Sequence, residues 1–507
     1  MKIHLVFAPT NFHLNPGDLG CGNDPPLGIL YLASWLRQYG PQDLELACTD
    51  GPIWGLDETI AKVLENPPDV LGISCTTTNV IGGFKLAQAV KAAHPAVKIV
   101  FGGPHSSALP EETLDRSPTD AVVIGEGEVT FGELIDHWRR GVTDPEQLMT
   151  IPGLCLRVGD RFVRTVPRGF IEDLDTIPFP ARDLIDLRPY KGYPLARKRP
   201  STTILIARGC PFACTFCANN IWREGEEERP VYRVRSPDNV VAELRQLVGM
   251  GFLSFFDNSD EFNTGLKKPK ELLRKIIAAD LGIEIMAQFR AVPIDDELVD
   301  LMVEAGLWYV HLGIETGNPE TLEGTAKKVK FNKVEECCRI LKKRGIKVWG
   351  LFMYFNVWEN PDGSLAIEDV EKSTRTLEYA KSLYKRKLID FFGGSITTPV
   401  PGSGLWQIAS RHNLIKPECV GNWDMWFYKR DLRLVSIFPG VSEAEIFKLH
   451  QKTIKYTALG LIKARVLDFR NLPFTLRRGS YFLKREVLRL GKVVLDSLSL
   501  PGSGASS

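Results

Sequence analysis

The chain has 507 residues, of which 44% are hydrophobic and 25% are charged, as is usual for a soluble globular protein. Its 63 lysines and arginines balance 62 aspartates and glutamates, so the formal net charge is +1 and no overall field attracts nucleic acid or an anionic membrane. No apolar run approaches the roughly 18 residues of a membrane span, so a polytopic membrane protein is disfavoured, and the length predicts about three domains.

The first 140 residues alternate short β-type runs with helical patterns. We expect strands at 2–8, 44–49, 70–75, 97–102 and 121–124. Amphipathic helices are predicted between them, for example at 27–38, 79–93 and 130–138. Apolar runs separated by such helices are typical of a parallel sheet covered on both faces. Residues 1–140 are therefore predicted to form an open, doubly wound Rossmann-like domain, in which ligands bind beyond the carboxyl ends of the strands.

Small and polar residues follow four of these predicted strands. The stretches lie at 15–28, 74–79, 102–107 and 125–128. Turn and capping chemistry can explain any one of these loops. Four such loops at one edge of a sheet favour a large ligand that the backbone approaches closely. A GxGxxG pattern does not follow the first strand, which disfavours a dinucleotide.

Residues 141–200 are rich in proline and are predicted to form a connector, with one hairpin signal at 153–166. From 201 to 404 the β-then-helix alternation resumes. Strand candidates lie at 203–207, 252–256, 283–289, 309–313, 347–353 and 391–396. This pattern predicts a partial (β/α)6 barrel of parallel strands, with its chemistry at their carboxyl ends.

Residues 405–507 are predicted to form a mainly helical C-terminal domain that caps the site and selects the substrate. Four aromatic residues cluster in it, and core packing is favoured over a place in a pocket: Trp423, Trp426, Phe427 and Tyr428. The basic stretch 461–507 has the pattern of an amphipathic helix, for which docking onto the barrel is favoured over contact with a membrane surface.

Three of the ten cysteines form a CxxxCxxC cluster directly after a predicted strand: Cys210, Cys214 and Cys217. Thiolates suit zinc or iron–sulfur centres. A structural zinc site requires four ligands, and no nearby Cys or His supplies the fourth. Three ligands would instead leave one iron of a 4Fe–4S cluster open to a substrate or cofactor. Most of the other cysteines are scattered singly, and the start of the chain does not resemble a secretory signal, so we expect a reducing cytoplasmic location.

The cluster motif, with Phe216 before its last cysteine, and the β/α units that follow it resemble the radical S-adenosylmethionine (SAM) superfamily. The N-terminal half is similar to the cobalamin-binding domain that precedes many such cores. The similar stretches are PPLGILYLASWL at 25–36, GGPHSSALPEE at 102–112, VVIGEGE at 122–128 and DLDTIPFPARDL at 173–184. The resemblance covers about residues 1–400 and implies three cofactors, which are a 4Fe–4S cluster, SAM and cobalamin.

The resemblance also implies which residues bind these cofactors. The three clustered cysteines would hold the iron–sulfur cluster, whose open iron SAM chelates. The residues expected to bind SAM are Phe216, Asp257, Gln288, Arg290 and Glu315. Among these, the guanidinium of Arg290 matches the geometry of the SAM carboxylate. Each of these polar residues could instead cap a helix or pair with a neighbour. Catalytic residues beyond the cysteines are not predicted.

For cobalamin, the expected contacts come from the loops at the strand ends. They are Ser74, Thr76, Thr77, Asn79, Gly102, Gly103, His105, Gly125, Glu126 and Gly127. The DxHxxG motif of mutase-type domains, whose His replaces the lower axial ligand, does not occur. We therefore expect cobalamin to bind without a His ligand, and His105 to hydrogen-bond within the pocket rather than to coordinate cobalt.

Most relatives with this cofactor pair place methylcobalamin opposite SAM, which implies a C-methyltransferase that acts on an unactivated carbon. A cyclase or rearrangement enzyme with no net methyl transfer is the first alternative, and a non-catalytic cofactor-binding sensor is the second. Methylthiolation is disfavoured because Cys337 and Cys338 on a predicted helix are poor candidates for a second cysteine set. The expected partners are a small-molecule substrate and a reductant such as flavodoxin or ferredoxin, with no nucleic acid.

Overall fold

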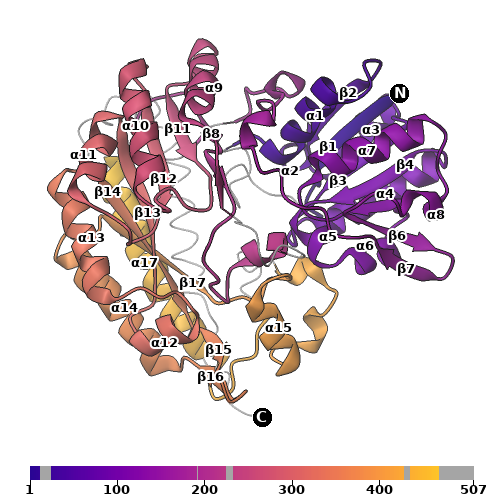
Figure 1. Cartoon of the computed structure of the whole chain (residues 1–507). Coiled ribbons are helices and arrows are strands. Elements are labelled where there is room, and N and C mark those ends of the chain that lie inside the picture. The colour runs from indigo at the N-terminus through magenta and orange to yellow at the C-terminus, as the bar shows by residue number, and fades with distance from the viewer. Residues whose placement is uncertain (12–23, 191, 194, 224–231, 427–433, 467–507) are drawn as a thin grey trace.

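A computed structural model describes residues 1–11, 24–190, 192–193, 195–223, 232–426 and 434–466. Two α/β lobes stand side by side, the N-terminal lobe in indigo and purple and the second lobe in pink and orange (Figure 1). Each lobe is built around its own mainly parallel sheet, so the predicted α/β class with two sheets is confirmed.

The N-terminal sheet has seven strands in the order β2-β1-β3-β4-β5-β6-β7. Its parallel strands are β1 (Lys2–Phe7), β2 (Glu45–Asp50), β3 (Val70–Ser74), β4 (Lys98–Gly102) and β5 (Ala121–Val123). This order reverses between β1 and β3, as in doubly wound folds that bind a ligand at that point. One face is covered by α1 (Leu27–Tyr39) and α7 (Gly127–Arg139), and the other by α3 (Leu56–Glu65) and α4 (Val80–Ala93).

The hairpin that the sequence predicts inside the connector forms, but it belongs to the N-terminal sheet. It consists of β6 (Leu154–Val158) and β7 (Arg161–Arg164). Strand β6 runs antiparallel to β5, with Val122 opposite Cys155. Leu154, Cys155 and Leu156 are fully buried there. Burial of these side chains against β5 and its helices explains the addition, so the N-terminal lobe continues past residue 140.

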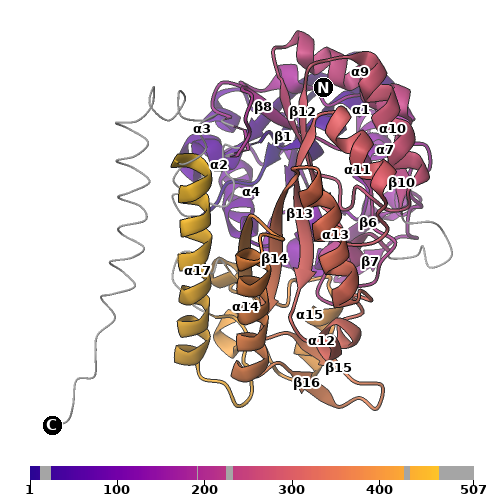
Figure 2. The ribbon, with the colours of Figure 1, turned by 90° about the vertical axis from the view of Figure 1, so that its left-hand side faces the viewer.

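The second sheet has six parallel strands whose order follows the chain, β8-β11-β12-β13-β14-β17. They are β8 (Ser201–Ile204), β11 (Ser254–Asp257), β12 (Glu284–Phe289), β13 (Leu307–Glu315), β14 (Lys347–Tyr354) and β17 (Phe391–Ile396). The helices on its outer face are α9 (Pro237–Gly249), α10 (Lys267–Ala279), α11 (Asp296–Glu304), α13 (Phe331–Lys343) and α14 (Val370–Lys385) (Figures 1 and 2). The predicted partial barrel is confirmed.

Side chains alternate between the two faces of each barrel strand, as strand geometry requires. On β13, Val310, Leu312 and Ile314 lie in the main core with the outer helices, whereas Tyr309 packs in a separate aromatic cluster on the inner face. The inner face of the barrel strands is therefore the face that a ligand bound inside the barrel would contact.

The described C-terminal part is helical, as predicted, and contacts both lobes. Helix α17 (Glu443–Val466) packs along β17 and α14 at the edge of the barrel (Figure 2). Trp423 and Trp426, 5.1 Å apart between ring centroids, are buried in the core of the N-terminal lobe, which confirms the packing role expected for them. Phe427, Tyr428 and the basic stretch from 467 onward lie outside the described residues. Within the described chain, no helix combines the length and apolar character needed to cross a bilayer.

Candidate functional site

A cavity of about 640 Å³ lies between the two lobes. The N-terminal lobe contributes the carboxyl ends of its parallel strands, for example Phe7, Ser74 and Gly102. The barrel contributes the end of β8, the short strand β9 (Ala207–Arg208) and the loop after β11. The wall therefore joins the strand-end loops predicted for cobalamin to the segment that leads into the cysteine cluster.

Seven of the ten predicted cobalamin residues line this cavity, namely Ser74, Thr76, Gly102, Gly103, Gly125, Glu126 and Gly127. Thr77, Asn79 and His105 do not, and they lie behind the wall instead. The Asn79 side chain accepts a hydrogen bond from the Thr76 backbone N–H at 2.7 Å and donates one to the Ala8 carbonyl at 2.8 Å. Asn79 therefore holds the loop after β3 in place, and its contact with cobalamin stays a prediction.

His105 is also absent from the cavity lining. It lies in the short helix α5 (Pro104–Ala108), is 1% exposed, and shares a hydrogen bond between its Nδ1 and the Thr77 hydroxyl at 3.2 Å. Its ring packs edge-on against Trp423, with 4.8 Å between centroids. Burial, helped by the charge of Arg116, lowers the pKa of His105 to about 3, so the imidazole is neutral. Its Nε2 has no hydrogen-bond partner among the described residues, so a hydrogen bond from His105 within the cobalamin pocket stays a prediction.

Glu126 lines the cavity, but its carboxylate is committed to an ion-pair network between the lobes. It accepts hydrogen bonds from Arg233 at 2.9 Å and from Arg208 at 3.3 Å, and Arg208 also pairs with Glu128 at 2.6 Å. Burial opposes ionisation of Glu126, yet the Arg233 hydrogen bond and the Arg208 charge outweigh it and hold its pKa below the ordinary value. We call these four residues the interlobe clamp. The network gives Glu126 a structural role that the sequence did not predict.

The glycines of the wall test whether a corrin ring fits. A Cβ added at Gly28 or Gly125 would meet no atom within 4 Å, and one at Gly102 would first meet the Val123 carbonyl oxygen at 3.7 Å. At these points the backbone faces open space, so a broad, flat ligand can lie directly against it. The cavity also has a largely apolar lining, as the face of a macrocycle requires. The residues present fit cobalamin.

The three clustered cysteines lie on the loop between β9 and the 3-10 helix η4 (Ala218–Arg223). Cys214 is buried, and Cys210 and Cys217 are half-buried. Burial raises the pKa of Cys210 to about 11, with a further rise from Cys217, and burial together with the charge of Cys214 raises the pKa of Cys217. The thiols are thus close enough to affect one another's ionisation. A cluster that binds each thiol through a different iron fits this arrangement.

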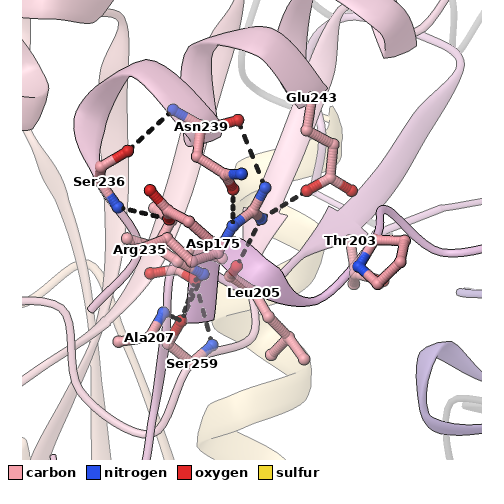
Figure 3. Close-up of polar contacts among 12 residues, drawn as sticks. Asp175, Thr203, Leu205, Ala207, Arg235, Ser236, Asn239, Glu243 and Ser259 are labelled. Carbon is pink, nitrogen blue, oxygen red and sulfur yellow. Dashed lines mark hydrogen bonds and ion pairs between the residues drawn. The ribbon is translucent and has the colours of Figure 1, made fainter. Parts of the chain in front are cut away.

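Hydrogen bonds support the strand that carries the cysteine loop (Figure 3). The Ser259 hydroxyl accepts from the backbone N–H groups of Ile206 at 2.8 Å and Ala207 at 2.9 Å. Arg235 donates to the Leu205 carbonyl at 2.9 Å and pairs with the buried Glu243. The segment between β8 and β9 is therefore held from both sides, which sets the position from which the cysteine loop departs.

Two buried cations lie beside the cysteines. Lys327 pairs with Glu315 at 2.7 Å, and the two side chains are only 9% and 13% exposed. Burial alone would lower the pKa of Lys327, but the charges of the nearby Glu315 and Cys214 outweigh this effect. The pKa is therefore raised above its ordinary value, and the ammonium stays charged. Arg290 stacks over the Phe212 ring at 3.7 Å and donates to the Lys327 carbonyl. The predicted Arg290 and Glu315 thus meet at one place.

Glu261 and Lys327 complete this charged group and were missed by the sequence analysis. Burial raises the pKa of Glu261 to about 7, although the positive charges of Lys327 and Arg290 lower it in part. The Oε1 atom of Glu261 has no hydrogen-bond partner in the described chain. Glu261 belongs to the acidic run that begins at the last residue of β11, from which Asp257 was selected instead. Lys327 follows a helix in a stretch without periodicity, so only the fold reveals it. Two cations and two carboxyls form a site suited to a zwitterion.

Asp257 is the last residue of β11. It is fully buried, and its Oδ1 accepts from the Ser259 hydroxyl at 2.5 Å and from the Ser259 N–H at 3.1 Å. Burial raises its pKa to about 6. It shapes the loop after β11 and does not line the cavity, whereas Asn258, Ser259 and Asp260 do. Gln288 lies half-buried on β12, and Phe216 packs half-buried against the barrel core. Contact of these residues with SAM stays a prediction.

Fold and site together define a radical SAM enzyme that carries a cobalamin-binding lobe. The Radical SAM superfamily model matches residues 204–362, and the B12 binding domain model matches residues 22–135. The "uncharacterized methyltransferase PH0819" of Pyrococcus horikoshii is 32% identical over 82% of this chain and 84% of its own length. The chain therefore belongs to the radical SAM superfamily, in the group with a B12-binding domain, and its cofactors are a 4Fe–4S cluster, SAM and cobalamin.

Other relatives differ in the reaction that their names give. The anaerobic magnesium-protoporphyrin IX monomethyl ester cyclase of Rubrivivax gelatinosus is 27% identical over 80% of this chain and 70% of its own length. Among solved structures, the radical SAM methyltransferase TsrM of Kitasatospora setae superposes with a TM-score of 0.63 at 20% identity, covering 82% of this chain and 77% of TsrM. The structural likeness supports the fold that the two lobes show.

Proposed function

We propose that this enzyme is a cobalamin-dependent radical SAM C-methyltransferase that methylates an unactivated carbon of a small molecule. The observation that carries the proposal is the shared cavity, whose wall runs from the strand-end glycines of the N-terminal lobe to Arg208 and Gly209, directly before Cys210. A macrocycle placed in that cavity lies next to the cysteine loop. The 32% identical relative with matching length is named a methyltransferase, which supports the same reaction class.

When bound, the three cofactors supply a reductive cleavage that creates a carbon radical and a methyl group that the radical takes up. The protein contributes position and charge. Cys210, Cys214 and Cys217 would hold the cluster through three thiolates. The cations Lys327 and Arg290 would bind the carboxylate of the methionyl group, and Glu261, whose Oε1 has no partner in the described chain, would accept from its ammonium.

The inner face of β14 and β17 is the proposed substrate wall. Leu351 and Met353 alternate on β14 with side chains of the main core and are only partly buried. On β17, Ser395 is exposed within the strand and follows Phe391 and Gly393 on the same face. None of these five residues is charged, whereas the β12–β13 side carries Arg290 and Glu315. The substrate part that meets this wall is therefore expected to be uncharged and largely apolar.

The aromatic cluster on the inner face of the barrel carries polar groups, and the Tyr193 hydroxyl also shares a hydrogen bond with the Tyr309 hydroxyl at 3.1 Å. Tyr193, from the connector, and His311, on β13, share a hydrogen bond of 2.6 Å between the phenol oxygen and Nε2. Burial lowers the pKa of His311 to about 4, so the imidazole is neutral. A neutral hydrogen-bonding cluster is compatible with an uncharged substrate. The described cysteines form no disulfide, which supports action in the reducing cytoplasm, with a flavodoxin- or ferredoxin-type protein as the reductant.

A ring-forming reaction without net methyl transfer is the second candidate, favoured by the likeness to the cyclase of Rubrivivax gelatinosus. The two reactions differ in their products. Methyl transfer converts one SAM to 5′-deoxyadenosine and a second to S-adenosylhomocysteine, and adds one CH₂ unit to the substrate. Ring formation yields 5′-deoxyadenosine without S-adenosylhomocysteine and adds no carbon.

The test uses the whole chain, reconstituted without oxygen with iron, sulfide and hydroxocobalamin, and methyl-labelled SAM with a chemical reductant. We expect both SAM products, and label in any substrate from a panel that spans apolar ring compounds, porphyrin esters and nucleotide conjugates. Formation of 5′-deoxyadenosine without S-adenosylhomocysteine would support the cyclase instead. Absence of both products from protein that carries all three cofactors would support a non-catalytic sensor.

A further inference from the structure

Asp50 ends β2 and lies on the wall of the interlobe cavity. Its side chain is deeply buried, with the residue only 7% exposed. The hydroxyl of Tyr190 donates a hydrogen bond to its Oδ2 at 2.9 Å. Its Oδ1 has no hydrogen-bond partner among the described residues. The protein therefore supplies a hydrogen bond to Oδ2 of this carboxyl group but none to Oδ1 among the described residues.

Asp24 repeats this pattern on the same wall. It precedes α1, lines the cavity, and its buried Oδ1 likewise has no hydrogen-bond partner in the described chain. Burial raises the pKa of both carboxyls to about 7. A buried polar atom left without a partner costs about 1–3 kcal/mol, and two on one cavity wall indicate that a ligand supplies the missing bonds.

The neighbouring wall narrows the chemistry of that ligand. Apolar residues line much of the same cavity, among them Leu5, Phe7 and Pro52. The cations that line the cavity, Arg208 and Arg233, are already paired with Glu126. A phosphate or carboxylate ligand would face two acidic groups with no opposing cation beside them. A neutral N–H donor satisfies both free oxygens without a charge, and the rim of a corrin ring carries such donors as primary carboxamides.

We propose that Asp50 and Asp24 bind the primary amides on the rim of the corrin ring and so fix its orientation in the cavity. The proposal rests on cobalamin as the ligand of this cavity. Tyr190 is a positioning residue in it. Its hydroxyl donates to Oδ2, which leaves Oδ1 as the unpartnered oxygen of Asp50 in the described chain, and Tyr190 comes from the connector between the lobes. Orientation of the ring is thus set jointly by the N-terminal sheet and by the segment that leads to the barrel.

The test measures binding, with no turnover. Hydroxocobalamin and its monocarboxylic acid derivatives, in each of which one rim amide is replaced by an acid, are titrated into the reconstituted full chain and followed by corrin absorbance. We expect at least one derivative to bind about tenfold more weakly than hydroxocobalamin, which corresponds to about 1.4 kcal/mol. The side-chain amide of Asp50→Asn can donate a hydrogen bond to the acid of that derivative. In this variant the same derivative should therefore bind as tightly as hydroxocobalamin or more tightly.

Further variants separate the roles. Asp50→Leu should weaken hydroxocobalamin about tenfold, and Asp24→Leu should do the same for a different amide position. Tyr190→Phe should weaken binding less and keep the discrimination, because the carboxyl remains. Asp160→Asn, at the exposed turn of the β6–β7 hairpin, is the matched control and should change nothing. If Asp50→Leu does not fold, Asp50→Asn with the derivatives still decides, since its shape is nearly that of Asp.

Three results would overturn the assignment in different ways. Equal binding of all derivatives by wild type and Asp50→Asn would exclude an amide contact at Asp50. Loss of the Asp50 effect with cobinamide, which lacks the nucleotide tail, would place Asp50 at the tail ribose instead. Failure of the wild-type chain to bind any corrinoid would overturn the cobalamin cavity and the proposed function with it, which the first two results would leave intact.

Discussion

The interlobe cavity and the charged group beside the cysteines treat polar groups in opposite ways. On the N-terminal side the wall is apolar and glycine-rich, and Asp24 and Asp50 keep carboxyl oxygens without partners in the described chain. Near the cysteines, the cation of Lys327 already has a carboxylate partner in Glu315. In the proposed arrangement, a large neutral ligand supplies the missing partners in the cavity, and the charged group beside the cysteines binds a small zwitterion. The comparison predicts that the cavity and the charged group can be disabled separately.

The largest expected effect is on the cysteine side. Replacement of Cys210, Cys214 and Cys217 by Ala should remove the cluster and lower 5′-deoxyadenosine formation by at least about 1,000-fold, since a barrier raised by about 4 kcal/mol already has that effect. Cobalamin binding should persist, because its wall belongs mainly to the other lobe. Iron, sulfide and corrin analysis of the same sample checks both points. Cys48→Ala, on β2, is the control, and loss of corrin together with iron would contradict the separation.

Lys327 sharpens the comparison from within the charged group. Lys327→Met leaves the buried Glu315 without its cation and should lower the free energy of unfolding by about 3–5 kcal/mol. Urea denaturation measures this loss. The double variant Lys327→Met/Glu315→Gln should regain most of that stability but bind SAM at least about tenfold more weakly than wild type. Lys343→Met, exposed on α13, is the control. Full SAM affinity in the double variant would show that Lys327 only stabilises the fold.

Gly28 addresses the open side. It lines the cavity from α1 in a helical conformation, and a Cβ there meets no atom within 4 Å. Gly28→Phe should place a ring where the corrin lies and weaken cobalamin binding about 10–100-fold, or about 1.4–2.8 kcal/mol, with SAM binding unchanged. Gly249→Phe, at the equally open end of α9, should leave cobalamin binding as in wild type. Normal corrin affinity in Gly28→Phe would place the ligand elsewhere.

The smallest effect is a pH dependence of the cofactor-free protein. Burial raises the pKa of Asp50 from 3.8 to about 7, so the folded chain holds a proton that the unfolded chain releases. Stability from this group is therefore lost as the pH rises from about 4 to about 7. Asp50→Asn removes the loss and should be more stable than wild type by on the order of 1–2 kcal/mol at pH 8, with water in the open cavity reducing the full effect. Thermal melts should show no difference near pH 4.

Much of the fold was predictable because buried parallel strands are short apolar runs. All six barrel strands and the five parallel strands of the first sheet lie where such runs occur, as β3 (Val70–Ser74) illustrates. The hairpin was visible from Gly159 and Asp160 at its turn, but its partner was not. The pairing of Val122 with Cys155 joins residues far apart in sequence, and no local pattern records it.

In the candidate site, too, the residues with local sequence patterns were predicted, and those whose role depends on distant partners were not. The cysteine triad and the glycines at strand ends are local signals, and they were found. The roles of Glu126 and His105 depend on partners that lie far away in the chain, which are Arg233 for the carboxylate and Trp423 for the ring. In the sequence, nothing distinguishes Asp50 from an ordinary residue at the end of a strand. Its role becomes apparent only from the hydrogen bond that the Tyr190 hydroxyl donates to it in the structure. Contacts across the interface of two lobes are therefore what the sequence could not supply.

The interlobe clamp has a consequence for building new enzymes from this scaffold. Arg208 stands two residues before Cys210, and opposite Arg233 in the two-stranded sheet of β9 and β10 (Arg233–Val234). Both arginines depend on carboxylates of the other lobe. A chimera that grafts a foreign cobalamin domain onto this barrel would remove the carboxylate partners that Glu126 and Glu128 supply to these two arginines, unless it also carries acids at positions 126 and 128. Exchange of the cobalamin domain must therefore preserve the acidic residues of the interlobe clamp together with the arginines that they pair with.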